Sequence, residues 1–121
     1  MILKRTVSSE FIKCFNETII LDEDIEIKLN NKHKVYKEDL SDALGDSYLV
    51  VLKPKQTSPA PKGKSKGKVF EILGETEEGR VLFIIGRLFS DGNLYIITAY
   101  WADSALEKIY RQESKVLREN E

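Results

Sequence analysis

Closely spaced apolar segments, most of them in the second half of the chain, predict an antiparallel sheet. We expect four strands, over residues 48–52, 68–73, 80–89 and 93–99. Two turn sequences separate the last three strands, Glu77-Glu78-Gly79 and Asp91-Gly92, and Asp-Gly is one of the strongest short hairpin signals. The third strand is apolar on both faces between Val81 and Ile85, which is typical of a central strand.

Apolar residues three or four positions apart predict three helices, over residues 23–32, 37–44 and 104–117. Asp22 is expected to cap the first helix, and Gly45 is expected to end the second. Ser104 and Glu107 have the spacing of a capping box at the start of the third helix. The side chains expected to face the core from this helix are those of Ala105, Ile109, Val116 and Leu117.

The order of these elements predicts an α+β fold. We expect a small antiparallel sheet of about four strands, with two N-terminal helices and a C-terminal helix packed on it. A length of 121 residues favours a single domain, residues 1–121, with a core over 22–117. Residues 1–21 form an N-terminal extension that includes a short strand near 18–21. What precedes that strand is open between strand, helix and extended chain.

Composition limits the classes of chemistry that are possible. The net charge of −1 indicates no partner by itself, and Cys14, as the only cysteine, excludes an internal disulfide and any multi-cysteine metal site. No cofactor motif is found, and no nucleotide-binding or metalloprotease signature. Neither a signal peptide nor an apolar run of membrane-spanning length is visible, so we expect a soluble cytoplasmic protein without membrane partners.

Residues 55–67 form a polar segment rich in proline and glycine, which we interpret as a mobile basic loop between two strands. The stretch from 53 to 68 contains six lysines and no acid, namely Lys53, Lys55, Lys62, Lys64, Lys66 and Lys68. Such a strip can bind a nucleic-acid backbone without reading its sequence, because counterion release supplies the affinity. The alternative is a solvated linker that its own charge keeps extended.

His33 and Arg80 are the best candidates for chemistry. A histidine can act as a general base or acid near neutral pH, and His33 follows Lys32 at the end of a predicted helix. Its alternative role is that of a surface or capping side chain. Arg80 lies beside a turn, where a guanidinium can clamp a phosphate through two hydrogen bonds, and its alternative is a salt bridge to a nearby glutamate. Trp101 is expected in the core, or in a binding contact.

Three segments together resemble the BrnT-like toxins, which belong with the RelE/ParE-like toxins of bacterial type II toxin–antitoxin systems. The similarity covers about residues 22–111. It is carried by Asp24-Ile25-Glu26-Ile27-Lys28-Leu29 with Lys32-His33-Lys34-Val35, Glu38-Asp39 and Ala43-Leu44, by Gly74-Glu75-Thr76-Glu77-Glu78-Gly79-Arg80, and by Ile96-Ile97-Thr98-Ala99 followed by Glu107 and Tyr110.

The resemblance implies a metal-independent endoribonuclease that a tightly bound antitoxin silences, acting on RNA such as mRNA with or without the ribosome. In such cleavage a base takes the 2′-hydroxyl proton, cations stabilise charge on the phosphorus, and an acid protonates the leaving oxygen. The implied roles are base or acid for Lys32 and His33, phosphate clamp for Arg80, and supporting donor for Tyr110. The lysine loop would hold the RNA backbone.

One departure from the family pattern keeps a second interpretation open. Tyr100 follows Ala99 at a position where the family usually has arginine. A tyrosine does not supply the positive charge that a developing phosphorane needs, so the chain is alternatively a catalytically silent toxin-like domain that binds a protein or nucleic acid. A third interpretation is an unrelated domain with a similar strand order.

Overall fold

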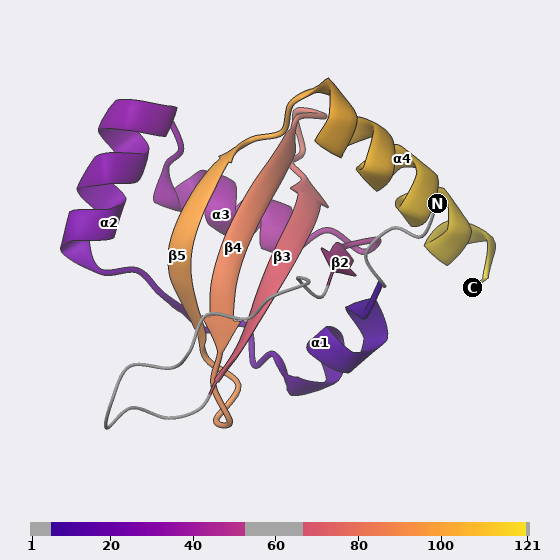
Figure 1. The fold of residues 1–121 in the computed structure, drawn as a ribbon, viewed down its shortest axis with the longest axis horizontal. Coiled ribbons are helices and arrows are strands. Elements are labelled where there is room, and N and C mark those ends of the chain that lie inside the picture. The colour runs from indigo at the N-terminus through magenta and orange to yellow at the C-terminus, as the bar shows by residue number, and fades with distance from the viewer. Residues whose placement is uncertain (1–5, 53–66, 121) are drawn as a thin grey trace.

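A computed structural model describes residues 6–52 and 67–120 and shows an α+β architecture (Figure 1). Its sheet has the strand order β1-β5-β4-β3-β2. The strands are β1 Ile19–Ile20, β2 Val50–Leu52, β3 Lys68–Glu75, β4 Val81–Leu88 and β5 Leu94–Trp101. The last four pair antiparallel, as expected, with β4 in the centre. The sequence pattern gave about four strands, and β1 makes the sheet a mixed one of five because it pairs parallel with β5.

The helices are α1 Ser8–Cys14, α2 Glu23–Lys28, α3 Lys37–Leu44 and α4 Ser104–Glu119. The helix predicted over 23–32 continues beyond α2 as a π-helical turn, η1 Leu29–His33. The extension that the sequence left open contains α1, which buries Phe11 completely. Most of the predicted basic loop, and five of the six lysines of the stretch from 53 to 68, lie outside the residues that the structure describes.

One face of the sheet, here called the α3 face, is covered by α1, η1 and α3 and holds the larger core. Phe11, Leu29 and Leu40 from these helices pack against strand residues such as Ile72 and Ile84, and all five are 0–1% exposed. A side chain on Gly74 of β3 would meet the carbonyl oxygen of Ala43 on α3 at 2.2 Å. Glycine at this position therefore allows α3 to lie directly on the sheet.

The opposite face, here called the α4 face, is covered in part by α4 (Figure 1). The Tyr110 hydroxyl of α4 donates to the Asp46 carboxylate at 2.5 Å. The same carboxylate accepts from the backbone N–H groups of Tyr48 and Glu75, at 2.8 and 2.9 Å. Arg111 forms an ion pair with Glu75 at 2.5 Å. Polar contacts therefore fasten α4 to a smaller apolar core.

One of the two expectations about N-caps was wrong. The N-cap of α4 is Asp103, whose carboxylate accepts from the Leu106 N–H at 2.9 Å, so Ser104 is the first helical residue and the predicted capping box does not form. Asp22 is the N-cap residue of α2, as expected, but its side chain makes no cap bond and accepts from the Tyr95 hydroxyl instead. This hydrogen bond raises the pKa of Tyr95.

Two of the four side chains expected to face the core from α4, those of Ile109 and Leu117, pack against the sheet, and the other two do not. Ala105 is exposed, and Val116 is 51% exposed, whereas Leu106 and Tyr110 pack against the sheet together with Ile109 and Leu117. Within the described ranges no helix is long and apolar enough to cross a membrane. Nor do the described residues include a group of three or more His, Cys, Asp or Glu side chains arranged to hold a metal ion.

Candidate nucleic-acid interface

The end of η1 places His33 at the edge of the α4 face. Leu29 begins the turn with a buried side chain, and its carbonyl accepts from the Val35 N–H at 3.0 Å. Lys34 ends the turn in the left-handed conformation, with φ at 55°. The half-buried imidazole of His33 lies against Tyr100, with 5.9 Å between ring centroids. A π-helical turn is uncommon and is frequently found at functional sites.

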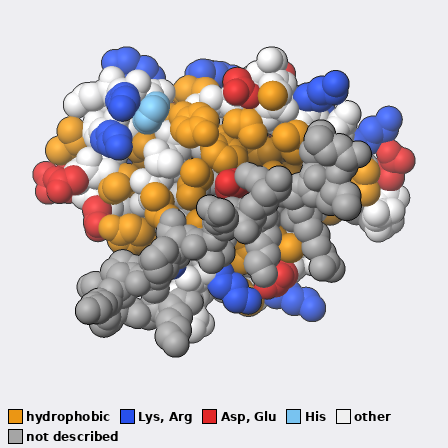
Figure 2. Space-filling model, in the orientation of Figure 1, with side chains coloured by type: hydrophobic (Ala, Val, Ile, Leu, Met, Phe, Trp, Pro, Cys, Tyr) orange, Lys and Arg blue, Asp and Glu red, His pale blue; other side chains and the backbone are white. Residues whose placement is uncertain are grey.

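An aromatic series continues from His33 across the α4 face. The Tyr100 ring lies 5.1 Å from that of Phe83 on the neighbouring strand. Figure 2 shows the histidine beside blue cationic side chains, with hydrophobic side chains continuing from it across this face. Lys32, immediately before His33, is exposed. An imidazole and an aromatic ring therefore meet near the end of β5, and an exposed lysine precedes the imidazole in the chain.

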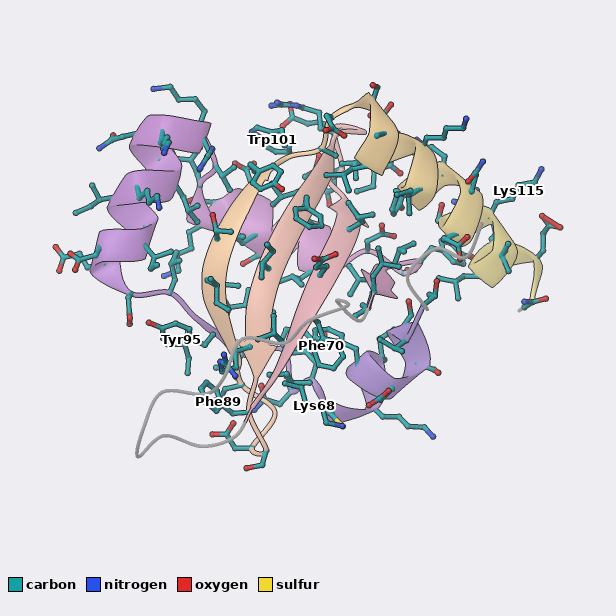
Figure 3. All side chains as sticks on the ribbon, viewed as in Figure 1. Lys68, Phe70, Phe89, Tyr95, Trp101 and Lys115 are labelled. Carbon is teal, nitrogen blue, oxygen red and sulfur yellow. The ribbon has the colours of Figure 1, made fainter. Side chains whose placement is uncertain are left out.

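Trp101, the residue after Tyr100, projects from the opposite side of β5 and contacts both η1 and Arg80. Its indole N–H donates to the Lys34 carbonyl at 3.2 Å, which ties η1 to the strand end. The Arg80 guanidinium lies over its ring, with 3.7 Å from the central carbon to the ring centroid. Figure 3 shows Trp101 at the upper end of β5, between α2 and α4. The indole thus links Arg80 to the backbone beside His33.

Arg80 does not make the salt bridge considered as its alternative role. Glu75 is paired with Arg111, and within residues 6–52 and 67–120 no ion pair of Arg80 with a carboxylate is found. Its cation is therefore held by an aromatic face while its N–H groups are available to an anion. We call Lys32, His33, Arg80, Tyr100 and Trp101 together the His33 corner.

Tyr110, the fourth candidate from the resemblance, occupies a different position. It is 1% exposed between α4 and the sheet, and its hydroxyl donates to Asp46. Burial and this hydrogen bond raise the pKa of Tyr110 above its usual value. Its hydroxyl proton is thus held by Asp46 in a buried contact, and its place in the fold is that of a fastening for α4.

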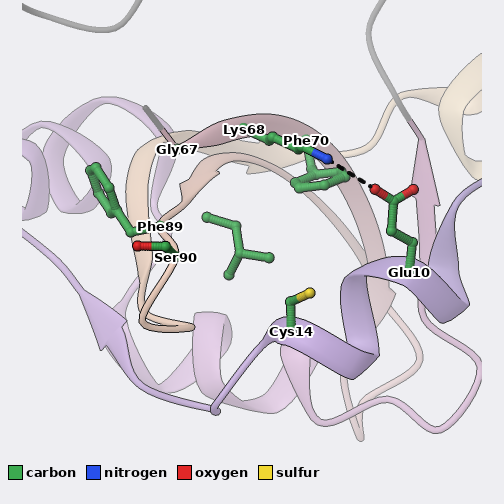
Figure 4. A pocket seen from close by; sticks show the side chains of 8 residues that line it. Glu10, Cys14, Gly67, Lys68, Phe70, Phe89 and Ser90 are labelled. Carbon is green, nitrogen blue, oxygen red and sulfur yellow. Dashed lines mark hydrogen bonds and ion pairs between the residues drawn. The ribbon is translucent and has the colours of Figure 1, made fainter. Parts of the chain in front are cut away.

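The structure describes one of the six candidate lysines, Lys68, at the far end of the sheet. Its ammonium forms a 3.4 Å ion pair with Glu10 at the rim of a hollow of about 420 Å³ (Figure 4). The exposed thiol of Cys14 lies in the same hollow. The hollow has no histidine in its lining, so no imidazole there activates Cys14 as a nucleophile. This hollow therefore lacks the groups that make the His33 corner a candidate site.

The sequence indicated Lys32 and His33 together because they are adjacent, and it singled out Tyr100 and Trp101, but it gave no signal for the contacts of these two rings. The ring of Tyr100 under His33 and the indole of Trp101 under Arg80 join segments that are far apart in the chain. Neither a protein-family model nor a curated protein matches this sequence. The chemistry of the corner's own side chains is accordingly the basis for assigning a function.

Proposed function

We propose that this chain is a metal-independent endoribonuclease, the toxin of a type II toxin–antitoxin pair that a bound antitoxin neutralises, and that RNA binds at the His33 corner. The observation that supports this most directly is the position of His33. Its imidazole is half-buried against Tyr100, with the exposed Lys32 beside it and the unpaired guanidinium of Arg80 at the same strand end. The likeness to BrnT-like toxins points to the same chemistry.

The proposed reaction is a transesterification within the RNA. His33 takes the proton of the ribose 2′-hydroxyl, and the 2′-oxygen then attacks the adjacent phosphorus. The bond from phosphorus to the 5′-oxygen breaks, leaving a 2′,3′-cyclic phosphate. Arg80 stabilises the charge that develops on the phosphoryl oxygens, and the Lys32 ammonium protonates the departing 5′-oxygen. Tyr110 is not needed as a donor in this scheme, since its proton is held by Asp46.

The test is cleavage of a single-stranded RNA by the purified chain in the presence of a metal chelator. We expect His33→Ala to slow cleavage by about 10²- to 10⁴-fold, the usual contribution of a general base. Arg80→Ala should cost about a hundredfold, as for removal of one group that stabilises transition-state charge. Lys28→Ala is the matched control, since Lys28 is an exposed lysine one turn before Lys32. An RNA with a single 2′-deoxy position should resist cleavage at that position.

A second candidate function is a catalytically silent domain that binds RNA at the same corner. It is favoured by one observation: Tyr100 and Trp101 are consecutive strand residues and project to opposite faces, so Arg80 on Trp101 and His33 on Tyr100 lie on different sides of β5. If Arg80→Ala weakens RNA binding while the parent protein leaves the RNA intact, this second function replaces the first. If neither binding nor cleavage is found in folded protein, both are rejected.

A further inference from the structure

A groove lies between α1 and α3, on the sheet face opposite the His33 ring. Two adjoining hollows of about 480 and 200 Å³ form it, and they share Phe15, Glu17, Leu44 and Gly45. We call it the α1–α3 groove. Its main lining side chains are Ile12, Phe15, Glu17, Ile19, Leu44 and Leu49. In Figure 1, α3 lies behind the sheet and α1 lies below β2. The His33 ring lies against Tyr100 on the α4 face, so the groove and this ring are on different faces of the molecule.

The groove has one exposed apolar side chain, that of Ile12, among others that are half-buried or buried against the larger core. Phe11 of α1 points into the core and is 0% exposed, whereas the next residue, Ile12, lines the groove and is 54% exposed. Phe15, three positions after Ile12, lines the groove as well. Helix α1 is therefore apolar on its core side and also on its groove side. An exposed apolar strip inside a concavity is a feature of protein docking sites.

The charge of the groove indicates what kind of partner fits it. Glu17 is the exposed charged side chain in its lining, because the Asp46 carboxylate accepts its hydrogen bonds from Tyr110, Tyr48 and Glu75 instead. Among the described residues, no lysine or arginine lines either hollow. Ser41 connects the groove to a further open hollow along α3, which is lined by four acids and one lysine: Glu38, Asp39, Asp42, Glu78 and Lys37. A phosphate backbone would be repelled by this rim, whereas a cationic peptide would be attracted.

We propose that the α1–α3 groove docks an amphipathic, lysine- or arginine-bearing helical segment of a partner protein. Apolar side chains at helical spacing insert among Ile12, Phe15 and Leu44, and the cations on the flanks face Glu17 and the acids of α3. A shallow apolar groove between two helices is the usual acceptor of such a segment. This inference does not depend on the proposed function, since the groove contains no residue of the His33 corner.

The probe for this surface is a synthetic 15-residue helical peptide with leucine on one face and lysine elsewhere. Its counterpart carries glutamate in place of every lysine. Binding to the full chain is measured by fluorescence anisotropy, and the affected residues are mapped by amide chemical shifts. We expect the lysine peptide to bind, to perturb the groove residues of α1 and α3, and to bind at least tenfold more tightly than the glutamate peptide.

Matched variants distinguish binding of the lysine peptide in the groove from its general attraction to acidic parts of the surface. Ile12→Ser and Glu17→Lys change the groove; Ile27→Ser and Glu23→Lys are the controls, because Ile27 is 50% exposed on α2 and Glu23 is an exposed acid there. Each groove variant should weaken the lysine peptide about tenfold or more, in line with loss of a buried isoleucine or an opposed charge. The controls should change the dissociation constant by less than about twofold.

Four results would overturn the proposal. These are equal weakening by the groove variants and the controls, equal affinity of the two peptides, perturbation of the groove by an RNA oligomer, and self-association of the free chain that Ile12→Ser abolishes. The last would mean that a second copy of this chain fills the groove. RNA cleavage by Ile12→Ser should equal that of the parent, so failure at the groove and failure at the His33 corner are seen separately.

Discussion

The two faces of the sheet are closed in different ways. On the α3 face, three helical segments bury a large and almost wholly apolar core, and Gly74 lets α3 approach the backbone of β3. On the α4 face, a single helix covers a smaller core and is fastened by Tyr110 to Asp46 and by Arg111 to Glu75. The part of this face near His33 keeps aromatic side chains only half-buried.

This difference separates the tasks of the two faces. Apolar packing gives the α3 face most of the stability, since free energy follows buried apolar area and fit. The α4 face combines a weaker apolar contact with hydrogen bonds of about 1 kcal/mol each. A face that is incompletely covered can present an imidazole and aromatic rings to a ligand. Substitutions on the two faces should therefore differ in what they damage.

The largest effect is expected at Gly74, where the two layers of the α3 face are closest. Gly74→Ala should lower the free energy of unfolding by about 3 kcal/mol, because the added methyl group would meet rigid backbone of α3. Gly45→Ala is the control; its added carbon would lie 3.4 Å or more from its neighbours, so a change within about 0.5 kcal/mol is expected. Urea titration measures both. Equal stability of Gly74→Ala and the parent would mean that the α3 face is not closely packed.

A smaller effect is expected at Asp46, the polar fastening of the α4 face. Asp46→Ala should cost about 2 kcal/mol, because it leaves the buried Tyr110 hydroxyl and two backbone N–H groups without their acceptor. Tyr110→Phe alone should cost about 1 kcal/mol. Adding Tyr110→Phe to Asp46→Ala should restore part of the lost stability, since it removes the orphaned hydroxyl but leaves two backbone N–H groups without their acceptor. Simple additivity of the two single changes in urea titrations would contradict the coupling.

The smallest effect is the dependence of α4 packing on alkaline pH. The pKa of Tyr110 is raised in the folded protein, so the neutral phenol is favoured there and the stabilisation is complete below pH 10. Above pH 10 the unfolded chain loses this proton first, and folding stability falls as pH rises. We expect the parent to lose about 1 kcal/mol more than Tyr110→Phe between pH 9 and 11. Tyr95, whose pKa Asp22 raises, contributes equally to both proteins. Parallel pH profiles would exclude this role.

Local patterns in the sequence were enough to predict most of the fold. The strands now seen as β3, β4 and β5 follow one another through tight turns, so alternation and turn residues located them within a few positions. The strand β1 was harder, because two residues make it and its partner β5 is distant in sequence. Helix α1 is short, and burial of Phe11 rather than a distinct period holds it in place.

The error at the start of α4 shows that two neighbouring residues can be almost equally good N-cap candidates. Asp103 and Ser104 are both good capping residues, and the carboxylate one position earlier is the one that bonds to the turn. The start of the helix does not decide which side chains face the sheet: Ile109 and Leu117 pack there as expected, and Leu106 and Tyr110 complete the buried side in place of Ala105 and Val116.

The candidate site was only partly accessible from sequence. Lys32 and His33 could be paired because they are neighbours, and Arg80 could be recognised beside its turn. The side chain that contacts Arg80 could not be predicted, because Glu75, Glu77 and Trp101 are all possible partners of its guanidinium. Only the fold shows that this partner is Trp101. The hydrogen bond from the Tyr110 hydroxyl to Asp46 could not be predicted either, because the two residues are 64 positions apart in the chain. Long-range pairing of polar groups has no periodic signal in the chain.

The pairing of the first strand has a consequence for synthesis on the ribosome. Ile19 and Ile20 of β1 pair only with Leu94 and Tyr95 of β5, and Thr6 donates to Glu113, 107 residues further on. Strand β1 therefore gains its pairing partner only when the last strand emerges, whereas α1 can already contact β2, and such non-local strand pairings form late. The η1 turn, which needs Trp101 to hold its end, belongs to this late group. A partly translated chain would consequently lack an assembled His33 corner.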